Sequence, residues 1–388
     1  MRPTVVSVVL SGLLLAGCDG GVADPAQMRL LVLGEDGNIA TVLPDGSERR
    51  LLTEDAGRQH RYFQPTWSPA GDRVAFSELA VRDGTQASAL VVADAEGDRQ
   101  AAFETTSPAF YLSWSPDGEH LGYLGNAPGG IELGMVQTDG AAGQPEILTQ
   151  GQPLYFSWAP DGQRLLAHID GARMVTISLE GEASELDVSP AAFQAPQWSH
   201  DRRAFAVAAD SGQQLVIAAP DDTRRQVVAF EGFISFLLSP DGDRIAYRAL
   251  SATSPGELVV QSADGDRRSA ARNPVVAFFW SPDGRKLLYL VPEPEEEAPW
   301  FRWYVWDGEE SQPLGRFVPS PILARDYLPF FDQFAQSLSF WSPGSDAFVY
   351  AGRGEDGGEG IWIQRLGGDR EPEPVTKGLF ASWPPAGP

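Results

Sequence analysis

The sequence predicts an all-β protein in which short strands form a ring of small sheets. A motif of Trp, Ser or Ala, Pro, a variable residue and Gly recurs about every 40–47 residues, with one interval of about 61. Each motif is followed by two apolar positions separated by one residue, and then by a β-branched run that ends at a Gly or Asp turn. A period of this length with strand-like content is typical of β-propeller blades, which have four strands each.

Each copy of the motif predicts a hairpin. Its Pro-Asp-Gly segment forms a tight turn, because Pro restricts φ, Asp bonds to its own backbone and Gly accepts a positive φ. Seven and nine residues after the first position, apolar residues such as Ile245 and Tyr247 would face the same side of a strand. The Trp that opens the motif would pack as a wedge between neighbouring blades. The copies begin at Trp67, Trp114, Trp158, Trp198, Leu238, Trp280, Trp341 and, truncated, at Trp383.

The two ends of the repeat region lack complementary strands. Residues 29–53 read as three strands without a Trp-containing innermost strand, and residues 379–383 read as an innermost strand with nothing after it. We expect the C-terminal strand to complete the N-terminal blade, because ring closure removes exposed sheet edges. Seven internal blades and this composite blade give eight. Seven blades are the alternative if the copy at Trp198, with its Ser-His-Asp-Arg turn, is not a blade.

The pattern Trp-Ser-Pro-Asp-Gly-x-x-Ile-Ala-Tyr, present over residues 238–247 with Leu in first place, resembles the TolB-type propeller repeat. The same repeat occurs in the propellers of prolyl-oligopeptidase-like enzymes. The resemblance implies a TolB-like propeller over residues 28–388, and the long interval between Trp280 and Trp341 indicates an insertion at 315–338. TolB carries a separate α/β domain before its propeller, and the oligopeptidase relatives carry a hydrolase domain. In this chain only a short segment precedes the first strand, and no residues are left for a hydrolase domain.

The N-terminus predicts export. Residues 1–17 are expected to be a signal peptide, because Arg2 precedes an apolar stretch over residues 5–15 that ends in small residues. The stretch is too short to persist as a transmembrane helix.

The signal ends at Cys18, the single cysteine of the chain, in a Leu-Ala-Gly-Cys segment that resembles the bacterial lipobox. The resemblance implies lipidation of Cys18 and a lipidated N-terminus and tether over residues 18–27. An ordinary secretory signal with an incidental cysteine is the alternative. Asp19 resembles the residue that retains lipoproteins in the inner membrane, so we expect the inner membrane in preference to the outer.

The charge of the chain restricts its partners. The formal net charge is −24 and the isoelectric point is about 4.5. Nucleic-acid binding requires a basic surface, so this class of function is excluded. A charge-driven contact with anionic lipid is disfavoured for the same reason. The negative field favours partners with basic or metal-bearing surfaces.

No local motif indicates catalysis or cofactor binding. The sequence has no His-Glu-x-x-His pair, no Gly-x-Ser-x-Gly segment and no Gly-rich phosphate loop. Its Asp-rich turns have too few carboxylates for a calcium loop. Other copies of the repeat carry Arg or Lys at the position of His120, so we expect an exposed strand residue there. We therefore expect a non-enzymatic protein without cofactor or metal. The histidines are His60, His120, His168 and His200.

Three irregular segments are expected to cluster. Within a blade, the two hairpin turns lie on one face of the ring, which we call the turn face. The middle loop and the connection to the next blade lie on the other, which we call the long-loop face. The acidic loop 293–297, the insertion 315–338 and the Gly-rich loop 352–360 belong to the long-loop face of adjacent blades. Variable loops on a rigid scaffold commonly carry binding sites.

The insertion has two interpretations: a packed connector with about one helical turn and an internal Arg–Asp pair, or a cap over the ring that contacts a partner. The acidic loop is likewise either a solvated surface or a contact. The candidate partner-contact residues are Glu293, Glu295, Glu296, Glu297, Arg325, Asp326, Asp332, Gln333 and Gln336.

These observations favour a membrane-anchored extracytoplasmic lipoprotein whose propeller is a protein–protein docking scaffold in the bacterial cell envelope. We expect it to be monomeric, to be held by the lipid on Cys18, and to turn its long-loop face away from the membrane. The alternative is a ligand-binding or enzymatic propeller, sugar-active or peptidase-like, with its site in the central channel. Innermost strands that are mostly aromatic and apolar favour docking. A sensor or accessory domain of an exporter is a third possibility.

Overall fold

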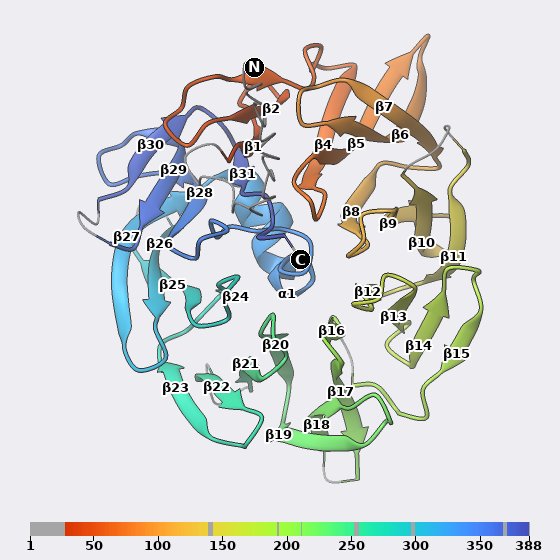
Figure 1. The fold of residues 1–388 in the computed structure, drawn as a ribbon, viewed down its shortest axis with the longest axis vertical. Coiled ribbons are helices and arrows are strands. Elements are labelled where there is room, and N and C mark those ends of the chain that lie inside the picture. Colours follow the sequence, from red (N-terminus) through yellow and green to blue (C-terminus); the bar gives the residue numbers. More distant parts are fainter. Residues whose placement is uncertain are drawn as a thin grey trace, which may run out of the picture.

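A computed structural model describes residues 28–387, except for 139–142, 192–193, 211, 252–255, 296–298 and 368–370. Its strands form six four-stranded sheets and one seven-stranded sheet, arranged as a ring around a central axis (Figure 1). The predicted lipidation site Cys18, the neighbouring Asp19 and two of the candidate contacts, Glu296 and Glu297, lie outside the described residues. The predicted all-β propeller is confirmed.

The first three sheets follow one another around the ring, each running from an innermost to an outermost strand. In that order they are β31 (Phe380–Ser382), β1 (Leu30–Leu33), β2 (Ile39–Val42) and β3 (Arg50–Leu51); then β4 (His60–Trp67), β5 (Arg73–Arg82), β6 (Thr85–Asp94) and β7 (Arg99–Thr105); then β8 (Ala109–Trp114), β9 (His120–Ala127), β10 (Gly130–Gln137) and β11 (Glu146–Gly151).

The remaining sheets repeat the arrangement. They are β12 (Leu154–Trp158), β13 (Arg164–Ile169), β14 (Arg173–Ser178) and β15 (Ala183–Glu185); then β16 (Gln197–Ser199), β17 (Arg202–Ala209), β18 (Gly212–Ala218) and β19 (Arg224–Phe230); then β20 (Phe233–Leu238), β21 (Arg244–Leu250), β22 (Leu258–Ser262) and β23 (Arg267–Ala271); and the seven-stranded sheet β24 (Ala277–Trp280), β25 (Leu287–Pro294), β26 (Pro299–Trp306), β27 (Ser311–Pro319), β28 (Ala347–Arg353), β29 (Glu359–Arg365) and β30 (Glu373–Thr376).

The C-terminal strand closes the ring, as predicted. β31 pairs antiparallel with β1, with Leu31 opposite Ser382 and Leu33 opposite Phe380. The pairing covers the inner edge of β1, which would otherwise be open to strand addition. The pairing also determines on which face of the ring the described chain begins, because β1 then runs from the turn face towards the long-loop face. Met28 therefore lies on the turn face.

The seven-stranded sheet contains one complete blade and most of another. β24–β27 form four strands, and a short pairing of Val318 with Arg353 links β27 to β28. On the inner side of β28, the chain around Trp341 takes the place of an innermost strand and pairs through an isolated bridge between Trp341 and Phe348. The copy at Trp198, which had suggested seven blades as the alternative, forms its own four-stranded sheet, β16–β19. This grouping of strands is consistent with eight blades.

Several of the repeat tryptophans join neighbouring blades. The indole Nε1 of Trp280 donates a hydrogen bond to the carbonyl of Leu237 in the preceding blade at 3.1 Å. Trp158 donates in the same way to Ser113 at 3.0 Å. Basic side chains that follow several of the turns extend this contact to the next blade. Arg73 donates to the carbonyl of Gly118 at 2.7 Å and lies 5.0 Å from the ring of Trp114.

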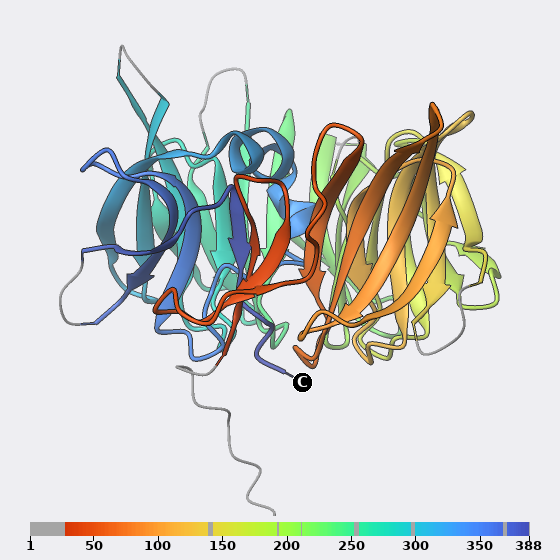
Figure 2. The same cartoon turned by 90° about the horizontal axis from the view of Figure 1, so that it is seen from above.

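The insertion differs from the prediction in its bounds and in its place. Residues 315–319 belong to β27, because they pair with β26 and β28. Three short helical segments follow: the π-helical turn η2 (Leu323–Tyr327), the 3-10 turn η3 (Leu328–Phe330) and α1 (Phe331–Phe334). They enter the ring, and α1 lies near its centre (Figures 1 and 2). We call residues 320–338 the plug. Among the described residues, no helix is long and apolar enough to cross a lipid bilayer.

Candidate functional site

The plug is attached to the innermost strands through Gln333. Its side-chain oxygen accepts a hydrogen bond from the backbone N–H of Phe156 at 3.1 Å, and its amide nitrogen donates to the carbonyl of Phe156 at 2.8 Å. The hydroxyl of Tyr111 donates to the backbone carbonyl of Gln333 at 3.1 Å. Gln333 is buried. The prediction that Gln333 contacts a partner is therefore corrected: it holds the plug in the ring.

Three further hydrogen bonds fix the plug to other blades. Gln197 donates from its amide to the backbone carbonyl of Asp332 at 3.0 Å. Gln336 donates to the carbonyl of Pro196 at 3.3 Å, and Thr66 donates to the carbonyl of Ser337 at 2.9 Å. Asp332 and Gln336 thus lie inside the ring and not on an exposed cap. The structure agrees with the packed-connector interpretation of the insertion.

Aromatic contacts also hold the plug in the ring. Phe331 packs edge-on against Phe278 with ring centres 4.8 Å apart, and Tyr327 stacks on Phe380 of the closing strand at 4.3 Å. Such contacts contribute about 0.5–1.5 kcal/mol each beyond the burial of area. The plug therefore also supports the strand that closes the ring.

The carboxylate of Asp332, in the plug, has a displaced pKa. Protein surrounds its carboxylate and displaces water, and this raises its pKa to about 6. A hydrogen bond from the backbone N–H of Gln333, at 3.1 Å, offsets part of the rise. Asp332 therefore changes its charge in a mildly acidic range in which an ordinary Asp stays ionised.

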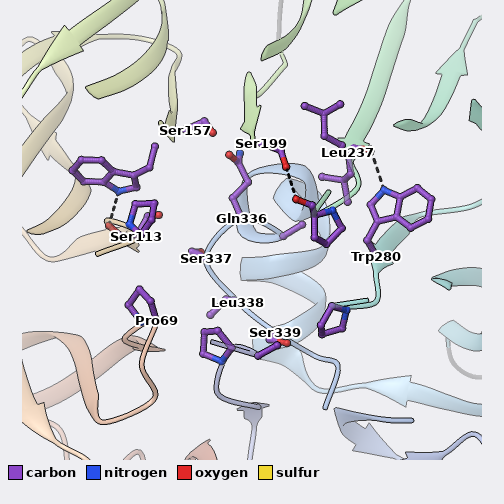
Figure 3. A pocket seen from close by; sticks show the side chains of 18 of the residues that line it. Pro69, Ser113, Ser157, Ser199, Leu237, Trp280, Gln336, Ser337, Leu338 and Ser339 are labelled. Atoms are coloured by element: carbon purple, nitrogen blue, oxygen red, sulfur yellow. Dashed lines mark hydrogen bonds between the residues drawn. The ribbon is translucent and has the colours of Figure 1, made fainter. Parts of the chain in front are cut away.

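The plug separates two cavities. One, of about 540 Å³, opens on the turn face and is lined by Trp and Pro side chains of the repeats, by Gln336 and Ser337 of the plug and by residues 385–387 (Figure 3). The other, of about 520 Å³, lies beside the plug near the starts of the innermost strands and thus on the long-loop side. Arg325 and Asp326, two of the predicted contact residues, line the second cavity.

The acidic loop, the first residues of the predicted insertion and the Gly-rich loop lie together as predicted, and Arg316 links them. Its guanidinium forms ion pairs with Glu295 of the acidic loop and with Glu355 of the Gly-rich loop. The guanidinium groups of Arg316 and Arg353 lie 4.8 and 5.3 Å from the ring centre of Trp300. We call these five residues, together with Glu293, the loop cluster.

The acidic loop is consequently less acidic than its sequence suggests. Glu293 accepts a hydrogen bond from Nε of Arg302 at 2.5 Å, and Glu295 pairs with Arg316. The positive charges that neutralise them come from β26 and β27, two strands in which no contact residue was predicted. The loop cluster therefore presents an aromatic ring with paired charges and not a bare negative patch.

A polar cluster that no sequence motif had indicated surrounds His60 in the second blade. His60 is hydrogen-bonded through Nδ1 to Asp55 at 2.7 Å and through Nε2 to the buried Glu78 at 2.8 Å. Arg99 pairs with Glu78 at 3.0 Å, and the hydroxyl of Tyr62 donates to Asp55 at 2.6 Å. The bond from Tyr62 lowers the pKa of Asp55, while burial raises the pKa of Tyr62. The one sequence signal for this cluster was the spacing of His60 and Tyr62, which are two residues apart and therefore face the same side of a strand.

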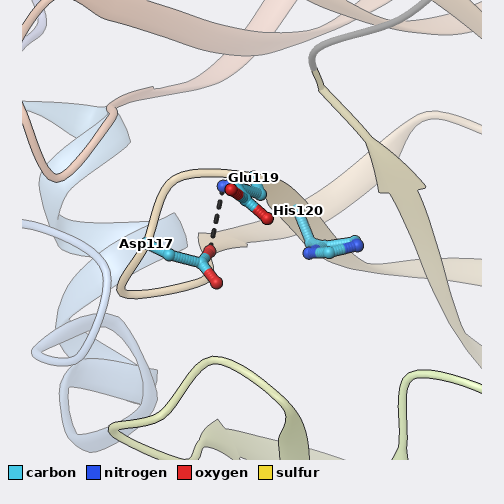
Figure 4. Close-up of side chains that lie close together, drawn as sticks. All are labelled: Asp117, Glu119 and His120. Atoms are coloured by element: carbon cyan, nitrogen blue, oxygen red, sulfur yellow. Dashed lines mark hydrogen bonds between the residues drawn. The ribbon is translucent and has the colours of Figure 1, made fainter.

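Asp117, Glu119 and His120 could hold a cation. One potential ligand atom from each lies within 4.8 Å of the others (Figure 4). The carboxylate of Asp117 already accepts hydrogen bonds from the hydroxyl of Ser115 and from the backbone N–H of Glu119, at 2.9 Å for the latter. These bonds are the ones expected of the repeat turn, so the turn accounts for the position of Asp117 without a metal.

The ring resembles solved propellers. One structure, described as a eukaryotic initiation factor, is 12% identical, covers 92% of this chain and 99% of its own, and has a TM-score of 0.59. The β-propeller domain of the Trilobed protease from Pyrococcus furiosus is 15% identical, covers 83% of this chain and 100% of its own, and has a TM-score of 0.52. The fold is that of a β-propeller. TolB from Acinetobacter baumannii is also similar, at 15% identity over 70% of this chain and 74% of its own, with a TM-score of 0.41.

At these identities the likeness extends to the fold alone. No protein-family model matches the chain. No curated protein sequence matches it significantly either. The Pyrococcus domain is described as having an open velcro topology, whereas this propeller is closed by the pairing of β31 with β1.

Proposed function

We propose that this propeller is a docking scaffold of the bacterial cell envelope, and that the loop cluster is its partner-binding surface. The observation that carries the proposal is the position of Arg316, which ties the acidic loop and the Gly-rich loop to β27. A surface whose loops are already held in place loses less conformational entropy when a partner binds. Trp300 and its two flanking arginines supply the residue types that dominate binding energies at interfaces.

The plug supports docking over a central-channel enzyme. It occupies the middle of the channel and uses backbone groups of the innermost strands, such as those of Phe156, for its own attachment. A channel enzyme would need convergent polar side chains at that place. The expected partner is a protein of the envelope with a basic or mixed-charge surface, because the net charge of the chain is −24.

The lipid anchor on Cys18 completes the proposal. Since the described chain begins on the turn face, a tether over residues 18–27 would leave the long-loop face turned away from the membrane. The mature protein should carry fatty acid on Cys18, measurable by mass spectrometry of the intact chain. In cells, Cys18→Ser should move the protein from the membrane fraction to the soluble one. Unchanged membrane association of this variant would contradict the anchor.

The docking surface is tested by site-specific photo-crosslinking in intact cells. Photoreactive residues at Pro299 and Asp356, both exposed beside the loop cluster, should capture the same protein. The matched controls are Ser184 on the outermost strand β15 and Glu119 on the turn face, both exposed as well. Crosslinks of equal yield at the controls, or a yield at Pro299 that Arg316→Gln leaves unchanged, would argue against this surface.

A further inference from the structure

The cavity on the long-loop side of the plug has the size and the apolar walls that are common in ligand sites. It lies between the plug and the innermost strands β4, β8 and β12, and its volume of about 520 Å³ falls in the usual range of small-molecule sites. Its walls are mostly apolar, and Phe330 of the plug is 48% exposed. The aromatic wall residues are Phe63, Phe110, Tyr111, Tyr155, Phe330 and Phe334.

One ion pair stands among these aromatic walls. Nε and a terminal nitrogen of Arg325 donate to the two carboxylate oxygens of Asp326 at 2.7 and 2.9 Å. The side chain of Arg325 is 71% exposed and that of Asp326 29% exposed. Asp326 is thus the more enclosed residue of the pair. Its counter-charge is the guanidinium of the adjacent Arg325, which stands at the end of a long, exposed side chain. A cation from outside could replace this guanidinium without disturbing the plug.

The surroundings select the sign of the ligand's charge. The faces of aromatic rings attract cations, and one wall ring, Phe63, already has the guanidinium of Arg61 5.4 Å from its centre. Burial raises the pKa of Tyr155 and the nearby carboxylate of Asp332 raises it further, so Asp332 adds a negative charge near this wall. The net charge of −24 acts in the same direction. These three effects favour a cation over an anion as the partner of Asp326.

A strained residue also lines the cavity. Gln64 has a φ of 52°, in the left-handed region that non-glycine residues rarely adopt, and it lies at an irregularity of β4 between Phe63 and Thr66. Bulges of this kind redirect a side chain, and strained residues concentrate at functional sites. The irregularity brings a neutral amide, able to donate and accept hydrogen bonds, to an otherwise apolar wall.

We propose that this cavity binds a small organic ligand with one protonated amine on an aromatic or otherwise apolar body, with Asp326 as its counter-ion and Arg325 as the group that the amine displaces. The site goes beyond the docking role and does not depend on it, since the loop cluster and the cavity share no residue.

Three probes of similar shape and different charge test the proposal on the full chain by isothermal titration calorimetry: 2-phenylethylammonium, 2-phenylethanol and phenylacetate. The ammonium probe should bind at least about tenfold more tightly than the alcohol, and phenylacetate should be the weakest. Asp326→Asn should reduce the affinity for the ammonium probe to that for the alcohol. Arg325→Gln should raise it, because Asp326 is then free.

Two controls separate the site from general effects. Asp201→Asn removes the same charge from an exposed turn outside the cavity and should leave all three affinities unchanged. Retained binding of 2-phenylethanol by Asp326→Asn shows that this variant keeps its cavity. Equal affinities for the ammonium probe and the alcohol, preference for phenylacetate, an unchanged ammonium affinity in Asp326→Asn, or binding of no probe by the wild type would each overturn the proposal.

Discussion

The side chain of Gln333 pairs with the backbone of Phe156 as a second strand would, accepting from its N–H and donating to its carbonyl. An innermost strand of a propeller has no neighbour on its channel side, so its inward backbone groups need another partner. The primary amide of Gln333 supplies both an acceptor for the N–H and a donor for the carbonyl of Phe156. Through this contact a segment far along the chain is fixed to the fourth blade.

The first prediction concerns this amide. Gln333→Ala should lower the free energy of unfolding by about 2–4 kcal/mol, because it leaves two buried backbone groups of Phe156 without partners. Gln333→Glu should cost at least as much, since a carboxylate cannot donate to the carbonyl. Urea denaturation measures both, with the exposed Gln226→Ala as control. Equal effects of Gln333→Ala and the control would show that the pairing carries no stability.

Ring closure depends on Phe380 of β31, which is fully buried and stacks on Tyr327. We expect Phe380→Ala to destabilise the fold by about 3–5 kcal/mol. Leu51→Ala, at an exposed position of the same blade, should change stability by less than about 1 kcal/mol. Deleting residues 379–388 should expose the edge of β1 and cause association, visible by light scattering. A monomeric, cooperatively unfolding deletion variant would refute this account of closure.

The raised pKa of Asp332 predicts a pH dependence of stability. Its folded pKa of about 6 lies above the unfolded value near 3.8, so the folded state binds the proton more tightly. The contribution of Asp332 is therefore complete below about pH 4 and is lost as the pH rises through about 6. Asp332→Asn should be nearly neutral at pH 4 and stabilising by about 1–3 kcal/mol at pH 7.5. Denaturant titrations over this range measure the difference, and a constant difference would contradict the shift.

Arg316 should act on local order more than on global stability. Its ion pairs lie at the surface, so Arg316→Gln should change the free energy of unfolding by less than about 1 kcal/mol. The loops after β25 and β28 should nevertheless exchange their amide hydrogens several times faster, because their shared charge partner is gone. Hydrogen-exchange mass spectrometry tests this, with Arg173→Gln, which removes a surface pair with Asp170, as control. Unchanged exchange in both loops would mean that Arg316 does not order the loop cluster.

The variant Gln64→Gly separates the backbone strain at Gln64 from the contribution of its side chain to ligand binding. Glycine adopts a positive φ without cost, so the variant should be as stable as the wild type or more stable by up to about 1 kcal/mol. Its affinity for 2-phenylethylammonium should fall, because an amide of the cavity wall is lost. Thermal unfolding and calorimetry measure the two effects. A loss of stability with unchanged affinity would assign Gln64 a purely structural role.

The sequence alone determined the repeated part of this protein. The Pro-Asp-Gly turns, the tryptophan wedges and the closing strand at residues 379–383 follow from local rules, because turn residues act within four positions and strand faces alternate with a period of two. The clustering of the long loops was also predictable, since the order of strands in a blade decides on which face each loop emerges.

Only the tertiary structure decided where the insertion lies and which contacts hold the long loops together. Gln333 meets Phe156, and Thr66 meets Ser337, across large separations in sequence. A single amide side chain that bonds to a distant backbone forms no periodic pattern, so the sequence does not predict the contact. The aromatic residues of the insertion are equally compatible with an exposed cap and with a buried plug. The neutralisation of Glu295 by Arg316 likewise depends on two loops and a strand that meet only after the ring has formed.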